Sequence, residues 1–148
     1  MADRTTRGVS YIRIGSSTCS QSGSAVRISA QRISACCKLH RIALDATLID
    51  KGLVTQGEHG ERQTVLDEAL GMLRVGGPTL LIVPSMAHLA LSVGKLARLV
   101  EQHFGDGTFW FLAIAEGVDT RTDNGRFVLH LLRTLTQWDC EGEYNGKL

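Results

Sequence analysis

Residues 79–104 read TLLIVPSMAHLALSVGKLARLVEQHF, and they combine a strand pattern with a helix pattern. It begins with an apolar run that ends at Val83 and is followed directly by a proline, which is typical of a buried strand. Apolar residues then recur at helical spacing: Leu89, Val93, Leu96, Ala97, Val100 and Phe104. The stretch therefore predicts a strand at residues 80–83 and a helix after it.

The same alternation continues in both directions from this unit. Before it, the patterns predict strands at residues 9–14 and 41–50 and helices at residues 25–40 and 61–75. After it, they predict a strand at residues 109–115 and a last helix capped at residues 122–124. Strands that alternate with helices predict an α/β fold with a mainly parallel central sheet and helices on both faces.

One domain accounts for the length of 148 residues. We expect residues 1–8 to be a disordered N-terminus, residues 9–141 to form the domain, and residues 142–148 to be a short tail. No apolar block is long enough to cross a bilayer and no secretory signal is visible, so we expect a cytoplasmic protein. The cysteines lack a C-x-x-C pair and predict reduced thiols rather than a metal site: Cys19, Cys36, Cys37 and Cys140.

The charge is distributed unevenly along the chain. Residues 1–41 hold seven lysines or arginines against one aspartate, which gives +6, whereas the remainder carries −5. A basic first third would suit an anionic partner such as DNA, although solvated arginines on a helix explain it equally well. Neither G-x-G-x-x-G nor G-x-x-x-x-G-K-[ST] is present, so both common nucleotide fingerprints are absent from the sequence.

In a parallel sheet, the functional loops follow the carboxyl ends of the strands. Read together, those loops and their flanks resemble the serine site-specific recombinases, the resolvase/invertase family. Tyr11–Ile14 is similar to the family's opening Y-x-R-V, and Gln31 stands where a glutamine follows. Residues 50–52 resemble its D-x-G turn, and residues 61–62 the arginine that opens its second helix. Residues 116–141 give the most specific match, to E-x-[IV]-D-T-x-T-x-x-G-R and the apolar helix that follows.

The resemblance implies a resolvase-like fold and metal-free cleavage of DNA, with no cofactor. A serine hydroxyl attacks the scissile phosphate and forms a covalent phosphoserine link. Arginines surround the phosphate, because planar guanidinium groups can hold several oxygens of a phosphoryl transition state at once.

This chain keeps only part of the family's catalytic set. Arg13 and Arg62 stand at two of the arginine positions, but the serine of Y-x-R-V-S falls on Gly15. Ser16 and Ser17 are the nearest hydroxyls. Because neighbouring residues of a strand point to opposite faces, Ser16 could attack only if the strand has ended or bulged, and Ser17 starts about 7 Å further along.

The loop after the central strand departs further from the family. Its D-R-L-x-R-S aligns with residues 87–92, where Ala87 replaces the carboxylate and His88 and Leu91 replace the two arginines. His88 is the only residue of this loop that could still contact a phosphate. The loop resembles a catalytic loop that has lost its charges.

The sequence therefore predicts a resolvase-like domain without catalysis that acts as a dimerising or DNA-associated regulatory module. The candidate catalytic residues are Arg13, Ser16, Ser17, Arg62 and His88. The candidate nucleic-acid contacts are Arg13, Arg27, Arg32, Arg62, Arg121 and Arg126. We expect weak DNA binding, since no helix-turn-helix domain follows, and a homodimer through the last helix, whose apolar face ends at Trp138, or a hetero-oligomer with an intact recombinase. The alternatives are a divergent active recombinase that uses Ser16 or Ser17, and a small-anion or nucleotide-binding α/β module.

Overall fold

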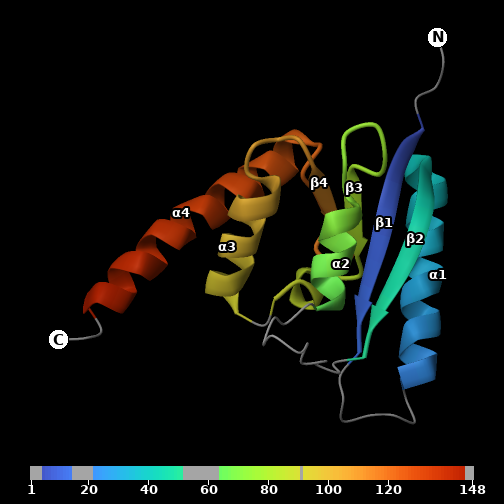
Figure 1. Cartoon of the computed structure of the whole chain (residues 1–148), viewed down its shortest axis with the longest axis horizontal. Helices are drawn as coiled ribbons and strands as arrows, with labels where there is room; N and C mark the ends of the chain where they lie inside the picture. The colour runs from blue at the N-terminus through green and yellow to red at the C-terminus, as the bar shows by residue number, and fades with distance from the viewer. Residues whose placement is uncertain (1–4, 15–21, 52–63, 91, 146–148) are drawn as a thin grey trace.

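The computed structural model describes residues 5–14, 22–51, 64–90 and 92–145, with the backbone alone at residue 22 and from residue 135 onward. Its elements follow one another in the order β1 (Thr6–Arg13), α1 (Ser22–His40), β2 (Ile42–Asp50), α2 (Val65–Met72), β3 (Leu80–Val83), the 3-10 helix η1 (Met86–His88), α3 (Val93–Phe104), β4 (Trp110–Ala113), β5 (Val118–Asp119) and α4 (Asp123–Asn145). Figure 1 shows them along the chain.

The strands form one sheet in the order β2-β1-β3-β4-β5. β1 to β4 are mutually parallel, so they all end at one side of the sheet, which we call the carboxyl edge. β5 pairs antiparallel with β4 and returns toward the opposite, amino edge. The predicted mainly parallel α/β fold is thus confirmed, with β5 as an addition.

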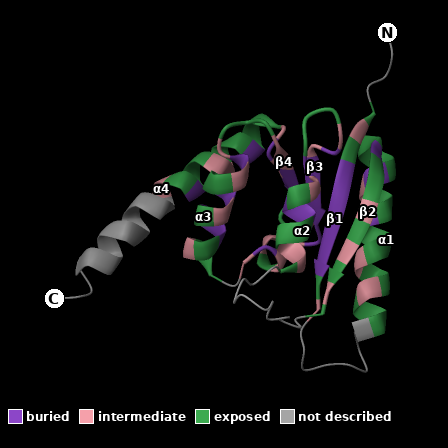
Figure 2. Cartoon of the chain, viewed as in Figure 1, coloured by how far each residue is buried: buried purple, intermediate pink, exposed green. Residues whose placement is uncertain are grey.

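Helices cover both faces of this sheet because alternate strand residues point to opposite sides. Leu81 of β3 and Phe111 of β4 pack on the side of α2, α3 and α4. Leu80 and Leu112 pack on the other side, against Ile33 and its neighbours in α1. Figure 2 shows the buried colour concentrated on β1, β3 and the inner sides of the helices.

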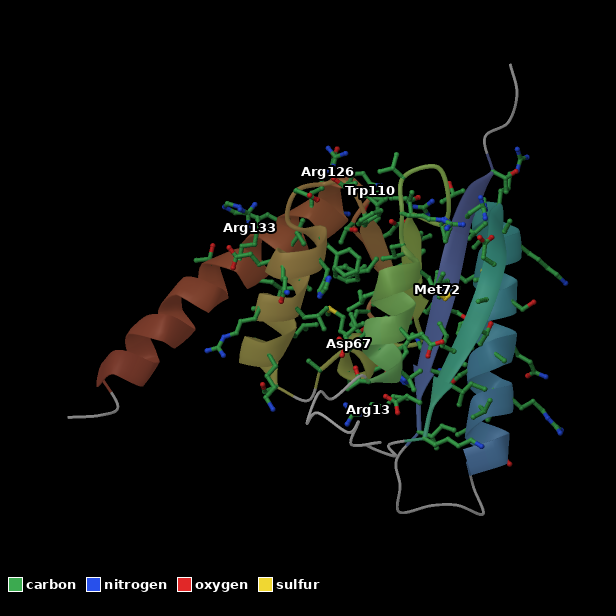
Figure 3. The ribbon with its side chains drawn as sticks, in the orientation of Figure 1. Arg13, Asp67, Met72, Trp110, Arg126 and Arg133 are labelled. Carbon is green, nitrogen blue, oxygen red and sulfur yellow. The ribbon has the colours of Figure 1, made fainter. Side chains whose placement is uncertain are left out.

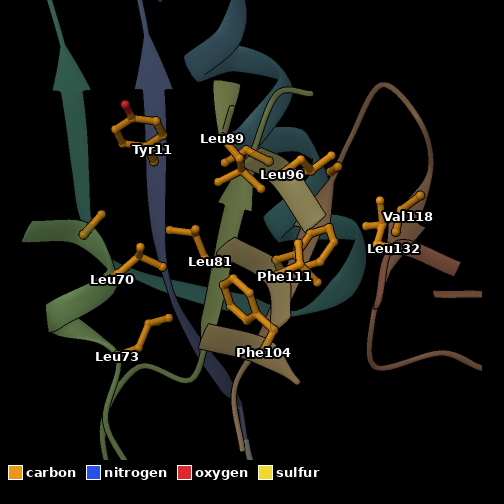
Figure 4. Packing of buried hydrophobic residues seen from close by; sticks show 14 of the residues in the cluster. Tyr11, Leu70, Leu73, Leu81, Leu89, Leu96, Phe104, Phe111, Val118 and Leu132 are labelled. Carbon is orange, nitrogen blue, oxygen red and sulfur yellow. The ribbon is translucent and has the colours of Figure 1, made fainter. Parts of the chain in front are cut away.

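The larger core cluster is built around two aromatic rings. Phe104, the last residue of α3, meets Phe111 edge-on with ring centroids 5.3 Å apart, and both side chains are buried. Figure 4 shows Leu81, Leu96 and Tyr11 completing the same cluster. Edge-to-face rings and close-packed aliphatic side chains stabilise the α3–β4 contact beyond simple area burial.

Several boundaries differ from those that the sequence predicts. β1 begins at Thr6 rather than residue 9, so Thr6–Gly8 join the sheet and are not part of a disordered N-terminus. α2 is shorter than predicted, since Thr64 caps it in a capping box with Asp67 and Leu73 is already extended. α3 begins after the cap Ser92, four residues beyond Leu89. α4 continues past residue 141 to Asn145, into the expected tail.

Within the part of the chain that the structure describes, no helix is long and apolar enough to cross a membrane.

Candidate functional site

The carboxyl edge brings together two of the predicted catalytic residues, Arg13 at the end of β1 and His88 at the end of η1. The backbone N–H of Arg13 donates to Nδ1 of His88 across 2.9 Å. The Arg13 side chain is exposed, and Figure 3 shows it at this edge, near Asp67 at the start of α2. The other candidates, Ser16, Ser17 and Arg62, lie outside the described residues, as do Gly15 and Leu91, where the sequence departs from the family.

This hydrogen bond fixes the protonation of His88. Because Nδ1 accepts this hydrogen bond, the ring proton of the neutral imidazole is on Nε2. Burial of the half-buried ring lowers the pKa of His88, and the charge of Arg13 lowers it further, although Glu116 opposes both. At neutral pH, His88 is therefore a neutral hydrogen-bond donor and not a substitute for a guanidinium cation.

η1 is held in place by a residue that the sequence reasoning did not single out. The backbone N–H of Met86 donates to Oε1 of Glu116 across 2.9 Å. Glu116 lies in the turn between β4 and β5, so its carboxylate joins that turn to the loop after β3. The sequence did contain a signal for this residue, because Glu116 is the first residue of the segment, residues 116–141, that most resembles the family.

A second polar contact joins the ends of β1 and β2. The hydroxyl of the buried Tyr11 donates to Oδ2 of Asp50 across 2.6 Å. Burial raises the pKa of Tyr11, and the hydrogen bond to Asp50 raises it further. Tyr11 therefore remains a protonated donor that orients Asp50 beside Arg13, its neighbour in the register of the two strands.

The predicted nucleic-acid contacts near β5 lie far from Arg13 in the fold. β5 carries residues 118–119 away from the carboxyl edge, so the candidate contacts Arg121 and Arg126, which follow it, do not lie there. Arg121 is bound to both carboxylate oxygens of Asp119, through Nε to Oδ1 and through Nη2 to Oδ2. Burial opposes ionisation of Asp119, but the hydrogen bonds from Arg121 prevail and lower its pKa. The guanidinium of Arg121 is thus largely committed to an internal partner.

Arg126 lies at the amino edge. Its guanidinium carbon is 5.8 Å from the ring centroid of Trp110, the first residue of β4, within range of a cation–π interaction. The start of α4 packs closely on β5 here, since a Cβ at Gly125 would lie 1.8 Å from the carbonyl oxygen of Asp119. Only glycine fits at this position, which explains the glycine of the matched segment. Arg27 and Arg32 are exposed on α1.

Among the described residues, no group of three or more His, Cys, Asp or Glu side chains could hold a metal ion.

We expect the pH dependence of folding stability to change in His88→Asn. The pKa of His88 is lowered by folding, so the unfolded chain binds more protons as the pH falls through about 6.5, and stability is lost there. Asparagine offers Oδ1 to the Arg13 N–H but does not titrate. Urea unfolding at pH 7 and pH 5 should therefore show a smaller loss of stability in the variant. His130→Asn, at an exposed position of α4, is the control. If His88→Asn loses as much stability between pH 7 and pH 5 as the unmutated chain, the lowered pKa of His88 in the folded state is contradicted.

Comparison with known proteins agrees with this geometry. The family model described as "Resolvase, N terminal domain" matches residues 8–143. The N-terminal catalytic domain of TP901-1 integrase is similar in structure, with a TM-score of 0.73, 19% identity, and coverage of 94% of this chain and 100% of that one. A resolvase family site-specific recombinase from Streptococcus pneumoniae gives a TM-score of 0.72 at 14% identity, with 96% and 93% covered. No curated protein has a significant match to this chain.

The chain therefore belongs to the resolvase family and has the fold of a serine recombinase catalytic domain.

Proposed function

We propose that this chain is a resolvase-family domain that no longer cleaves DNA and instead acts as a dimerising, DNA-associated module. The observation that carries the proposal is which side chains η1 presents and what they contact. There, a neutral His88 is bound to the Arg13 backbone, and Ala87 beside it has no functional group.

The chemistry of the family explains why this matters. Attack on a phosphate concentrates negative charge on oxygens that fixed cations must stabilise. His88 offers one neutral Nε2–H, and Arg13 is the one arginine among the candidate catalytic residues that the structure describes at this edge. In the sequence, the nucleophile position is Gly15, which supplies no oxygen. We therefore assign to this edge phosphate contact without strand cleavage.

The experiment compares non-covalent with covalent association. The chain is incubated with supercoiled plasmid, and complexes are analysed by native gel shift and by capture of protein-linked DNA after denaturation. We expect a native shift and no captured DNA. Captured DNA with a phosphoserine link would overturn the loss of catalysis, and the absence of any native shift would overturn DNA association.

DNA binding should be weak and strongly dependent on salt. An exposed basic row on α4 has i, i+4, i+7 spacing and consists of Arg126, His130 and Arg133 (Figure 3). Without base-specific contacts we expect a dissociation constant of about 10⁻⁴–10⁻⁶ M at physiological salt. Arg126→Gln should reduce the slope of log affinity against log salt by about one. Arg74→Gln, exposed on the turn before β3, is the matched control, and fluorescence anisotropy measures both.

Dimerisation is expected through α4. Phe127 and Leu131 are one turn apart, and their side chains are 63% and 47% exposed, which is unusual for large apolar residues on one helix face. The side chain of Trp138, which the sequence places at the end of this helix's apolar face, lies outside the described residues.

Phe127→Glu combined with Leu131→Glu should shift the chain from dimer to monomer in sedimentation velocity, because four carboxylates would meet across a symmetric apolar contact. Val75→Glu is the control, since Val75 is 80% exposed on the turn after α2. A dimer that persists in the double variant would exclude this face as the interface.

A further inference from the structure

A groove of about 590 Å³ lies between α1 and the β4–β5 side of the sheet. Its walls come from Cys36 and Arg32 of α1, its floor from Leu112 and Ile114, and its far end from Asp119 and Asn124. It is separate from the candidate site, because Leu112 points to the sheet face opposite Phe111 and Tyr11.

The groove exists because one helix covers this face of a five-stranded sheet. α1 packs its buried residues Ile33 and Cys37 with Ile12, Ile42 and Leu80, and Leu112 of β4 is also buried. Ile114, which follows β4, is only half-buried beside the groove. A ligand that covered this apolar floor would gain about 25 cal/mol for each Å² removed from water.

The charges along the groove favour an anion. Arg32 is exposed and, within the described part of the chain, has no hydrogen-bond or ion-pair partner. The one carboxylate of the lining, Asp119, is already bound by Arg121, and those hydrogen bonds lower its pKa. Cys36 stays a neutral thiol, because burial raises its pKa. Arg32 therefore supplies a free guanidinium to the described lining, which also includes His40.

We propose that this groove binds a small organic monoanion with an apolar body, such as an aryl or branched aliphatic carboxylate. Its carboxylate pairs with Arg32, and its apolar part lies on Leu112 and Ile114. The volume lies within the range of 300–1,000 Å³ usual for small-molecule sites. A nucleotide or other polyanion suits the groove less well, because Arg32 is the one arginine of its described lining and Asp119 lines the other end. This binding is independent of DNA association.

The test uses phenylacetate as the probe, with ¹H–¹⁵N chemical shifts of the full chain as the readout. We expect saturable shifts of the backbone amides of Gly117 and Asn124, and none at Arg13. Arg32→Gln should weaken binding about tenfold or more, because a charge-assisted hydrogen bond is lost. Arg27→Gln is the matched control, since it removes an exposed arginine of the same helix that does not line the groove.

A second variant and a neutral probe test the groove further. Ala35→Trp fills the groove from an exposed position of α1 and should abolish the shifts while thermal unfolding stays unchanged. Benzyl alcohol, which is apolar but neutral, should bind more weakly than phenylacetate. Equal binding of the two probes, binding unaffected by Arg32→Gln or Ala35→Trp, or no saturable shift at millimolar phenylacetate would each overturn the proposal.

Discussion

Supercoiled plasmid incubated with this chain is expected to remain uncut and to yield no covalent protein–DNA adduct. At the carboxyl edge, a neutral His88 is bound to the Arg13 backbone where the family has a guanidinium, and Gly15 stands at the position of the nucleophile. Loss of one phosphoryl-transfer arginine costs about 10³–10⁵ in rate, and loss of an oxyanion donor about 10²–10³. Such losses are not additive, yet even one of them makes turnover marginal.

A variant in which the family's residue types are restored, called the rebuilt chain, provides the comparison for this result. Gly15→Ser, Ala87→Asp, His88→Arg and Leu91→Arg restore the residue types of the family motifs, and a plasmid library with randomised inserts removes the need for a known site. We expect adduct formation to rise by about 10³ or more in the rebuilt chain. The same chain with Gly15 retained is the control for the nucleophile. An adduct of the natural chain that maps to Ser16 or Ser17 would refute the loss of catalysis.

The largest effect on stability is expected from Phe111→Ala. The ring is 0% exposed in the middle of β4 and packs edge-on against Phe104 (Figure 4). Its removal should lower the free energy of unfolding by about 3–5 kcal/mol, through lost burial and the cavity left behind. Because a domain of this size has about 5–15 kcal/mol in total, the variant should be close to unfolding. Urea denaturation followed by circular dichroism measures the difference.

Leu39→Ala is the control for this substitution. It deletes a large apolar side chain from a position of α1 that is 79% exposed, where the cost should stay within about 0.5 kcal/mol. Similar costs at the two positions would mean that β4 is not at the centre of the core.

Much of this fold could be predicted from the sequence, because the apolar pattern records burial directly. β3 was predicted at its observed bounds, since all four of its residues are buried and the run is continuous. β5 was missed because two residues are too few to show a period. The start of α3 was predicted less well: Leu89 was counted in its apolar stripe, but the helix begins at Val93, after the cap Ser92.

The candidate site was predicted in its residues but not in its contacts. The motif alignment singled out Arg13 and His88, and the parallel order of the strands places both at one edge. Sequence could not show that they meet through a backbone N–H, which depends on the turn geometry of η1. Nor could it show that Arg121 is bound by Asp119 two residues earlier, because that pairing depends on the turn that follows β5.

The antiparallel direction of β5 sets the position and direction of α4. By reversing the chain, β5 makes α4 start at the amino edge, and its 23 residues then extend for about 34 Å in the opposite sense. Figure 1 shows the far end of α4 level with the tips of β1 and β2. The distal turns of α4 therefore extend toward the carboxyl edge, the edge of the sheet that also carries Arg13.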